Sequence, residues 1–582
     1  MKGHMRSLKM IWFTAMAILG CGILAAGQQD PAPDTQSPPP ARMVQLPAST
    51  TASAPTSFDQ VIDRVVEREH FFVAEMRHMH PLVETYIQNM KPDKELGSVP
   101  VSDQYFLGRL DLTNGPQDRS FIKPPGFRKE MLNVLTNLYS MHFVPLGFAQ
   151  MVVLDDDLQK RFYKFGFVRR EFIGEIRCLV IDVQPKENSG KGRFLGRIWV
   201  EDQDYNIVRF NGTYYPHDQS NYYLHFDSWR LNLRPGVWLP AYIYSEESDV
   251  KYRMMQTLHF KAQTRLWGYD QKGIGGTEEF ATITVDPQTV RDQSEAGQDA
   301  SPVEAERLWQ RHAEDNALER LQKIGLMAPN GDVDKVLQTV VNNLVVTNNV
   351  ELTDIRTRVL LTSPLESFTI GHTIVVSRGL LDVLPDEASL AMILSRELAH
   401  IVLGHQIDSK LAFNDRMFFP DEKTFQSMGF KRSSQEEQEA DTRALQLLAN
   451  SPYKDKLGNA GLFLKALQSR APDLKSLIQA RLGDGLVSGK TLRMSALLNS
   501  APQLDERKKD QIAALPLGGR VRVDPWSDQI ELAKAKPVAL ISAREKMPFE
   551  VTPVFPYLIR STNASGERVA STAPAEPSST AK

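Results

Sequence analysis

Residues 395 to 405 read SRELAHIVLGH, and the positions around them are almost all apolar. A helix that is apolar on every side is a buried helix. An α-helix turns by about 100° per residue, so Arg396, Glu397 and His400 share one wedge of this helix. His405 falls on the opposite side and is expected to cap or pack near the helix C-terminus. Buried charge is costly unless it is paired or binds a metal, so the wedge requires partners from elsewhere in the fold.

Candidate partners stand at residues 434–441, which read SQEEQEAD. Glu437 and Asp441 are four residues apart and therefore share one face of the helix expected there. A second interpretation stays open, because Ser434 and Glu437 also fit a capping box at a helix N-terminus. The buried wedge upstream favours the interpretation of Glu437 and Asp441 as its partners.

The stretch from Ser367 to Asp441 resembles metallopeptidase family 48, which includes the CAAX prenyl proteases, the HtpX-type heat-shock proteases and soluble periplasmic relatives. Three phrases carry the resemblance, in the family's order: IVVSRGLL at 374–381, RELAH at 396–400 in the place of HExxH, and EQEAD at 437–441 in the place of ExxAD. The resemblance covers roughly residues 300 to 500. It implies a mainly α-helical, zincin-like peptidase domain.

The same resemblance implies zinc as the cofactor and a role for each matching residue. Glu397 would be the general base that activates zinc-bound water. His400 and Glu437 would be zinc ligands, and Asp441 would orient a ligand. Arg396 stands in the place of the family's first zinc-binding histidine.

Arginine in that place alters the expected chemistry. A hydrolytic zinc ion needs about three protein ligands and an open position for water. Arginine stays protonated and has no lone pair to donate. At about 4 Å and an effective dielectric constant near 20, its repulsion of a divalent cation is about 8 kcal/mol. We therefore expect tight zinc binding to fail, and the Arg396 guanidinium to form a two-point pair with Glu437 close to Glu397.

His372 and Ile374 belong to the segment that lies along the substrate in the family. His372 is the candidate for a replacement ligand. The matching edge strand would bind an extended peptide by strand addition, which needs no metal. In the family, the edge-strand segment begins with small polar residues. Here residues 366–368 (ESF) stand at its beginning, so the family's peptide preference does not carry over.

From about residue 152 to 285 the apolar pattern has a period of two, with polar turns between short runs. This pattern predicts an antiparallel sheet. The phrase GRIWVEDQDYNIVRFNGTY at 196–214 resembles the strand-turn-strand repeats of LolA-like lipoprotein carriers, whose open half-barrels hold acyl chains. An antiparallel domain without a ligand is the other interpretation of the same pattern.

The chain has 582 residues, 42% hydrophobic content and a net charge of −3, which indicates several domains and gives no sign of a nucleic-acid surface. Its two cysteines, Cys21 and Cys178, cannot cross-link a fold of this size. Three cations followed by an apolar run at 10–26 predict a secretory signal. A lipoprotein signal with Cys21 as the acylated residue and an uncleaved anchor remain alternatives. All three predict export to the periplasm or to an envelope membrane.

The expected fold class is α+β and multidomain, with an antiparallel, LolA-like β domain followed by a mainly helical zincin-like domain. The expected order is a signal peptide at 1–27, a disordered linker at 28–57, a helical N-terminal region at 58–150, an antiparallel β domain at 151–290, a metallopeptidase-like domain at 300–500, a short-strand region at 501–561 and a disordered tail at 562–582.

The first functional hypothesis is an exported metallopeptidase-family protein that acts on unfolded or extended envelope polypeptides, with zinc-dependent proteolysis impaired or lost because of Arg396. The second is an active zinc metalloendopeptidase with an altered ligand set. The third is a periplasmic carrier of lipid or lipoprotein in which the peptidase-like part is a scaffold.

Overall fold

The computed structural model describes part of the chain, and all of that part belongs to one compact unit, Ala52–Lys582. The predicted leader and most of the predicted linker lie outside the described residues, and so does the predicted tail. The described residues are 55–93, 97–113, 117–121, 148, 150–155, 158–190, 192–215, 224–252, 256–269, 302–352, 354–405, 421–489, 491–501, 521–523, 530–532, 549, 551 and 554–561.

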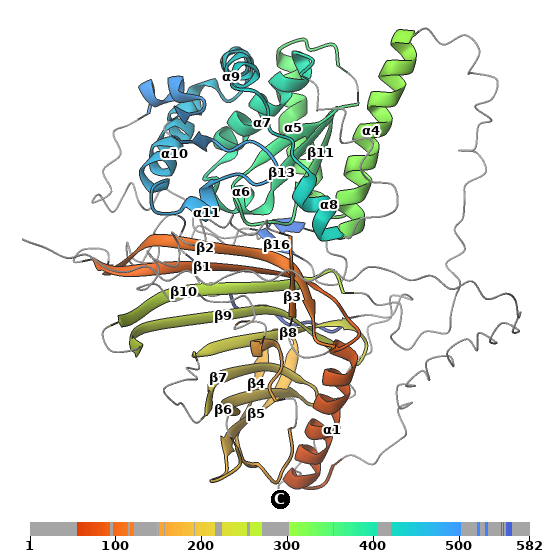
Figure 1. Ribbon diagram of the computed structural model, residues 1–582, viewed down its shortest axis with the longest axis vertical. Coiled ribbons are helices and arrows are strands. Elements are labelled where there is room, and N and C mark those ends of the chain that lie inside the picture. Colours follow the sequence, from red (N-terminus) through yellow and green to blue (C-terminus); the bar gives the residue numbers. More distant parts are fainter. Residues whose placement is uncertain are drawn as a thin grey trace, which may run out of the picture. The chain divides into compact units, whose positions relative to one another are not determined.

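Ten strands form the larger sheet (Figure 1). Their order is β3-β2-β1-β10-β9-β8-β7-β6-β5-β4, so neighbours in the sheet are consecutive in sequence except where β1 pairs with β10. The described pairings are antiparallel, as the period of two predicted. The strands are β1 (Leu82–Asp93), β2 (Gly97–Asp111), β3 (Gln117–Ser120), β4 (Tyr163–Ile173), β5 (Ile176–Pro185), β6 (Arg193–Glu201), β7 (Ile207–Tyr215), β8 (Phe226–Arg234), β9 (Val237–Tyr252) and β10 (Gln256–Trp267).

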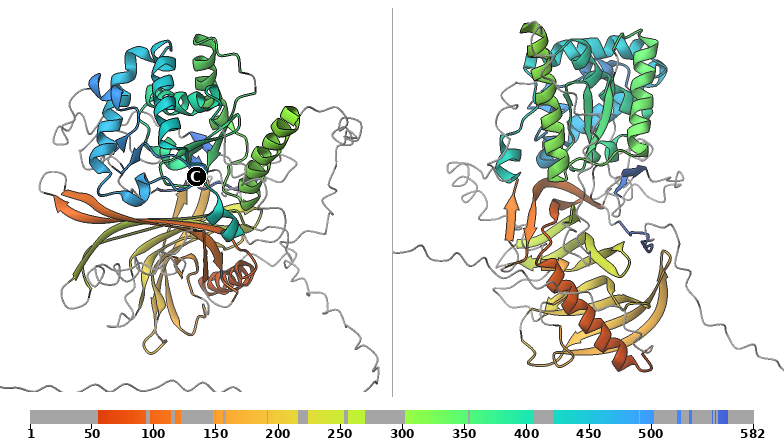
Figure 2. Two further views of the ribbon diagram at one scale, coloured as in Figure 1. Left: turned by 45° about the horizontal axis from the view of Figure 1, so that its top comes forward. Right: turned by 90° about the vertical axis from the view of Figure 1, so that its right-hand side faces the viewer.

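Helix α1 (Phe58–Met76) packs on one face of this sheet (Figure 2). The helix begins after Ser57, whose side chain accepts a hydrogen bond from the Gln60 amide. Its buried side includes Glu69, whose carboxylate accepts two hydrogen bonds of 2.7 Å from Arg230 on β8. A buried ion pair therefore holds the helix to the sheet.

The expectation of a helical region at 58–150 is wrong beyond α1, because β1, β2 and β3 occupy most of the described residues that follow. Strand β1 is buried on both faces and carries buried polar side chains, among them Glu84, Thr85 and Gln88. The alternation of apolar and polar residues that marks a half-buried strand is therefore missing. Its partner β10 is also remote in sequence, so no local signal predicts the pairing.

The peptidase-like region is built from helices around a small sheet of order β11-β13-β12. Strand β13 is parallel to β11 and antiparallel to β12, which makes β13 the central strand. Two short hairpins and 3₁₀ helices follow. The elements are α4 (Pro302–Ile324), α5 (Asp332–Thr347), β11 (Arg356–Leu360), β12 (Ser367–Ile370), β13 (Thr373–Ser377), α6 (Arg378–Val383), α7 (Glu387–Val402), α8 (Asp421–Ser427), α9 (Ser434–Ala449), η5 (Lys454–Lys456), α10 (Leu457–Arg470), α11 (Lys475–Ile478), β14 (Val487–Ser488), β15 (Thr491–Leu492), η6 (Ser495–Asn499), β16 (Val521–Val523) and β17 (Ile530–Leu532).

Helix α7 is the centre of this region. It begins after Asp386, whose carboxylate accepts from the Ser389 amide at 2.8 Å. From Ala388 to Ile401 every residue except Leu390 is buried, as its apolar composition predicted. The large antiparallel sheet and the helical peptidase-like region together confirm the α+β multidomain fold class.

A buried polar cluster joins β1 to the peptidase-like region. The carboxylate of Glu84 pairs with Arg378 of α6 at 2.9 Å, and Arg378 also pairs with Asp382 at 3.1 Å. Glu84 accepts further hydrogen bonds from the amide and hydroxyl of Ser363 and from the hydroxyl of Tyr105. The surrounding residues of β1 and β2 belong to the same hydrophobic core as α7. The first strands of the sheet are thus packed into the peptidase-like core.

Within the described part of the chain, no helix has the length and apolar content required to cross a membrane.

Replacing Arg378 by Met is expected to destabilise the fold by about 3–5 kcal/mol, because Glu84 would remain buried without its cation. Urea unfolding measures the loss. The double variant Glu84→Gln/Arg378→Met should lose clearly less, since Glu84 no longer leaves a buried charge without its cation. Lys335→Met, which breaks an exposed pair with Asp332, is the matched control and should leave the unfolding midpoint unchanged. An equal loss in the single and double variants would contradict the charge-stranding explanation.

Candidate functional site

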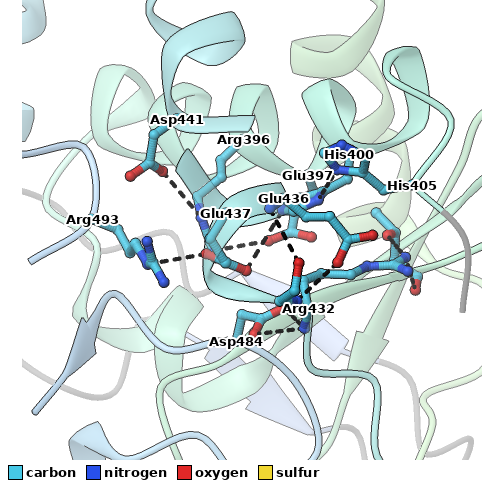
Figure 3. Close-up of polar contacts among 12 residues, drawn as sticks. Arg396, Glu397, His400, His405, Arg432, Glu436, Glu437, Asp441, Asp484 and Arg493 are labelled. Carbon is cyan, nitrogen blue, oxygen red and sulfur yellow. Dashed lines mark hydrogen bonds and ion pairs between the residues drawn. The ribbon is translucent and has the colours of Figure 1, made fainter. Parts of the chain in front are cut away.

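The charged wedge of α7 meets α9 in the interior of the peptidase-like region (Figure 3). Arg396, Glu397 and His400 are each 1% exposed, and Glu437 of α9 is 2% exposed. The side chain of Asp441, one turn further along α9, is 19% exposed. The structure therefore brings together the five residues that the two sequence phrases contributed.

The guanidinium of Arg396 lies between three carboxylates. Nη1 donates to Oε1 of Glu397 at 3.2 Å, and Nη2 donates to Oε2 of Glu437. Nε is 3.5 Å from Oδ1 of Asp441, within ion-pair distance. The sequence predicted a two-point pair with Glu437 alone. The observed arrangement differs, because the two ends of the guanidinium fork go to different carboxylates.

Burial and the neighbouring charges shift the pKa values of this cluster in opposite directions. Burial opposes the charge of Arg396, but the attraction of Glu397 and Glu437 outweighs it, and the pKa of Arg396 is raised. Burial raises the pKa of Glu397, although Arg396 and a 2.7 Å hydrogen bond from the Ser367 hydroxyl act against that rise. Burial likewise raises the pKa of Asp441, against the effect of Arg396. The permanent cation is what compensates the buried carboxylates.

Glu437 is not the capping residue of α9. The helix begins one residue earlier than the capping-box interpretation required, with Ser433 as the cap and Glu436 as its reciprocal partner. Glu437 therefore points into the interior, where Arg493 also contacts its Oε2 atom through Nε at 3.1 Å. Arg493 follows β15, and no motif in the sequence connects it with α9.

His400 is a neutral imidazole beside this cluster. Its burial, together with the nearby Arg396, lowers its pKa to about 2. Its Nδ1 atom is 2.9 Å from Nδ1 of His405. Its Nε2 atom is 3.7 Å from Oε1 of Glu437, and neither of these two atoms has a hydrogen-bond partner among the described residues.

His405 was expected to point away from the wedge, and that expectation is wrong. Helix α7 ends at Val402, and Gly404 has φ +70°, the left-handed conformation that reverses the chain. The His405 amide donates to the carbonyl of His400 at 3.0 Å, which closes the helix end. The reversal returns the His405 ring to the side of His400, so extrapolating the helix past Gly404 gave the wrong direction.

The residues present do not fit a hydrolytic zinc ion. His400 Nε2 and Glu437 Oε1 are two potential donor atoms, whereas such a site needs about three protein ligands. The other oxygen of Glu437 is engaged by two arginines, Arg396 and Arg493. Across the described residues, no group of three or more histidine, cysteine or acidic side chains is arranged to hold a metal ion.

His372 does not complete the site. It lies exposed in the turn between β12 and β13, beyond the end of β12 that is remote from Glu397. Ser367, at the near end, is the residue that contacts Glu397. The length of the strand alone separates the two ends by roughly 10 Å.

The prediction that the segment with Ile374 lies along a substrate does not fit an edge strand, because the edge next to this segment is formed by β12. Ile374 lies in β13, which is paired on both sides and has no free edge. The outer edge of β12 is already covered. Ser367 exchanges backbone hydrogen bonds with Asp484 at 3.3 and 3.0 Å, and Arg432 donates to the carbonyl and hydroxyl oxygens of Thr369 at 3.4 and 2.8 Å.

Two further contacts hold this cover in place. The buried carboxylate of Glu366 accepts from the three amides of residues 481–483 at 2.7–3.1 Å. The ring of Phe368 stacks on that of Phe430, with centroids 4.7 Å apart. We call residues 481–484 and Arg432 the β12 cover. Burial and the neighbouring Glu437 raise the pKa of Asp484 to about 8, so this residue belongs to both the cover and the charged cluster.

The fold and the cluster define a metallopeptidase-like domain with an arginine in its motif. Residues 332–510 match the family model described as Peptidase family M48, which confirms the resemblance drawn from the sequence phrases. No curated protein matches the chain.

Among solved structures, the chain is similar to a LolA superfamily protein from Nitrosomonas europaea, at 11% identity and a TM-score of 0.19, over 36% of this chain and 91% of that one. It is also similar to a DUF1329 family protein from Desulfovibrio piger, at 12% identity and a TM-score of 0.19, over 37% and 95% of the two chains. A third is a putative outer membrane lipoprotein-sorting protein domain from Vibrio parahaemolyticus, at 10% identity and a TM-score of 0.18, over 38% and 93%.

The depressed pKa of His400 predicts a specific pH dependence of stability. Below about pH 6.5 the unfolded chain binds a proton on this residue and the folded chain does not, so unfolding becomes easier as the pH falls from 6.5 toward 2. The His400→Gln variant should lack this contribution, which amounts to about 1.4 kcal/mol per pH unit. Urea unfolding of both proteins between pH 4.5 and 7.5 measures the difference (a range of about three units around the ordinary histidine pKa). Identical slopes would contradict this, because they would show that His400 binds a proton equally well in the folded and unfolded chains.

Proposed function

We propose that this protein is an exported member of the metallopeptidase type that has lost zinc-dependent hydrolysis and binds extended segments of envelope polypeptides. The match of residues 332–510 supports the metallopeptidase-family assignment of that domain.

The observation that carries the proposal is the buried guanidinium of Arg396 in the place of the first metal ligand, in contact with Glu397, Glu437 and Asp441. A bound divalent ion near His400 would meet this cation at short range, with a repulsion of several kcal/mol. Glu397 would also need to be free to accept a proton from water. Instead, its Oε1 atom is held by Arg396 and by Ser367.

Binding of an extended peptide depends on the edge of β12 and needs no metal. The cover that occupies this edge is a single backbone bridge at Ser367 and a side chain at Thr369, not a continuous strand. A peptide strand could replace these contacts with equivalent backbone hydrogen bonds. We infer that β12 is the binding site and that its cover is displaced on binding.

One described part of the large sheet argues against the hypothesis of a lipid carrier. The rings of Phe194, Phe210, Tyr214 and Phe226 contact one another, with centroids 5.4–6.3 Å apart. The protein's own side chains therefore fill the space that an acyl chain would need there.

Replacing Arg396 by His tests the loss of hydrolysis. We expect the unmodified protein to contain far less than one zinc ion per chain after purification and to cleave no casein. The Arg396→His variant should bind zinc and gain cleavage that a chelator abolishes, because Glu397, His400 and Glu437 remain in place. Arg396→Gln removes the cation without supplying a ligand and serves as the matched control.

The unmodified protein is measured as well, so one result decides the experiment even where a variant folds poorly. Stoichiometric zinc with chelator-sensitive cleavage in the unmodified protein would contradict the proposal and favour an active enzyme with an altered ligand set. Failure of a well-folded Arg396→His variant to bind zinc would show that Arg396 is not the sole obstacle.

Peptide binding at β12 is tested by weakening its cover. Arg432→Ala removes the hydrogen bonds to Thr369 and is expected to strengthen binding of a labelled, extended peptide by roughly threefold to tenfold, about the net contribution of one ordinary hydrogen bond. Fluorescence anisotropy measures the affinity. Arg443→Ala, which removes an exposed hydrogen bond to Gln446 on α9, is the matched control. Equal affinities in all three proteins would place the peptide site away from β12.

A further inference from the structure

Strand β4 is the outermost strand at one end of the ten-stranded sheet, and among the described residues its pairing partner is β5. Most of its positions are exposed. Three of them carry large apolar side chains: Phe167 is 52% exposed, Val168 36% and Phe172 70%. Single exposed apolar residues are ordinary on a protein surface, but three within six positions of one edge strand form a patch that requires an explanation.

Exposed cations are interleaved with this patch. Lys164, Arg169 and Arg170 are all exposed. Arg169 donates to Glu171 at 2.7 Å, whereas Lys164 and Arg170 have no carboxylate partner within the described part of the chain. The edge therefore presents aromatic rings beside uncompensated positive charge.

The same strand carries features that oppose pairing with another strand. The register of β4 against β5 shifts between Phe167 and Arg169, which makes Val168 a bulge. Bulges and adjacent cations are the devices that keep an edge strand from adding a further strand. A protein strand or a second copy of the chain is therefore a poor occupant of this edge.

An anionic membrane surface suits both components of the patch. Aromatic side chains settle at the boundary between headgroups and acyl chains, and lysine and arginine pair with lipid phosphates above them. We propose that the exposed edge of β4, with Phe167, Val168 and Phe172 beside Lys164 and Arg170, docks onto an anionic lipid bilayer.

The position of α1 supports this proposal independently. The ring of Phe58, the first residue of α1, packs edge-to-face on Phe167, with centroids 6.3 Å apart. The chain that precedes α1 therefore joins the described structure at the β4 edge. The acidic residues of α1 closest to this end, Asp59 and Asp63, lie within ion-pair distance of Lys160 and are partly neutralised. A membrane attachment at the N-terminus and the β4 edge would therefore contact the same bilayer surface.

Vesicle sedimentation with the full chain tests the proposal. The probes are vesicles of phosphatidylcholine alone and vesicles in which phosphatidylglycerol replaces a third of it (about the anionic content at which surface potentials become strong). The unmodified protein should bind the anionic vesicles more tightly. The double variants Phe167→Ser/Phe172→Ser and Lys164→Glu/Arg170→Glu should each weaken that binding by roughly tenfold or more.

The controls separate the β4 edge from other contributions. All variants keep the same N-terminal segment, so the difference between them reports β4. Tyr215→Ser removes an aromatic side chain of similar exposure (49%) from β7 and should bind as the unmodified protein does. Unchanged thermal unfolding shows that the variants are folded.

Two outcomes would overturn the proposal. In the first, Phe167→Ser/Phe172→Ser binds anionic vesicles as tightly as the unmodified protein. In the second, the unmodified protein forms a concentration-dependent dimer that this variant abolishes while vesicle binding is unaffected, which would make a second copy of the chain the occupant.

Discussion

The pairing of one buried guanidinium with several carboxylates is the constraint around which the peptidase-like region is arranged. Helix α7 is buried on nearly all sides, so its charged wedge has no access to water. Arg396 compensates carboxylates from its own helix and from α9, and thereby fixes the two helices against each other. In a metallopeptidase a metal ion would supply the positive charge at this place. Here the side chain of Arg396 places a positive charge there.

Buried arginine–carboxylate pairs also join elements at two other places in the chain. Arg230 and Arg378 are, like Arg396, among the largest fully buried side chains. Arg230 joins the sheet to Glu69 of α1, and Arg378 joins α6 to Glu84 of β1. Each pair connects elements that are far apart in sequence, and each would leave a stranded charge if one partner were lost. Buried arginine–carboxylate pairs thus specify which elements meet, and the altered peptidase motif has become one of them.

The sequence predicted what local patterns encode. The apolar composition around residues 395–405 located α7, the segment at 434–441 located the start of α9, and the motif spacing brought Arg396 and Glu437 together. Predictions from the sequence were wrong where contacts between distant parts of the chain determine the structure. Strand β1 is buried on both faces, so its sequence lacks the alternation expected of a strand. The chain reverses at Gly404, so His405 lies on the side of His400. The N-cap of α9 is Ser433, one residue before the predicted Ser434. Three members of the site were missed altogether, because no repeat or motif links them to α7 or α9: Arg432, Asp484 and Arg493.

Asp484 connects the two halves of the proposed function. Its backbone covers Ser367 at the edge of β12, and its carboxyl group lies close enough to Glu437 for burial and repulsion to raise its pKa to about 8. Ser367 in turn donates to Glu397, which Arg396 holds. A peptide that displaces Asp484 from β12 therefore removes one acidic group from the neighbourhood of Arg396 and leaves Ser367 bonded to both the peptide and Glu397. Under the proposed function, occupancy of the edge strand and the contacts of the buried cluster are coupled through Ser367 and Asp484.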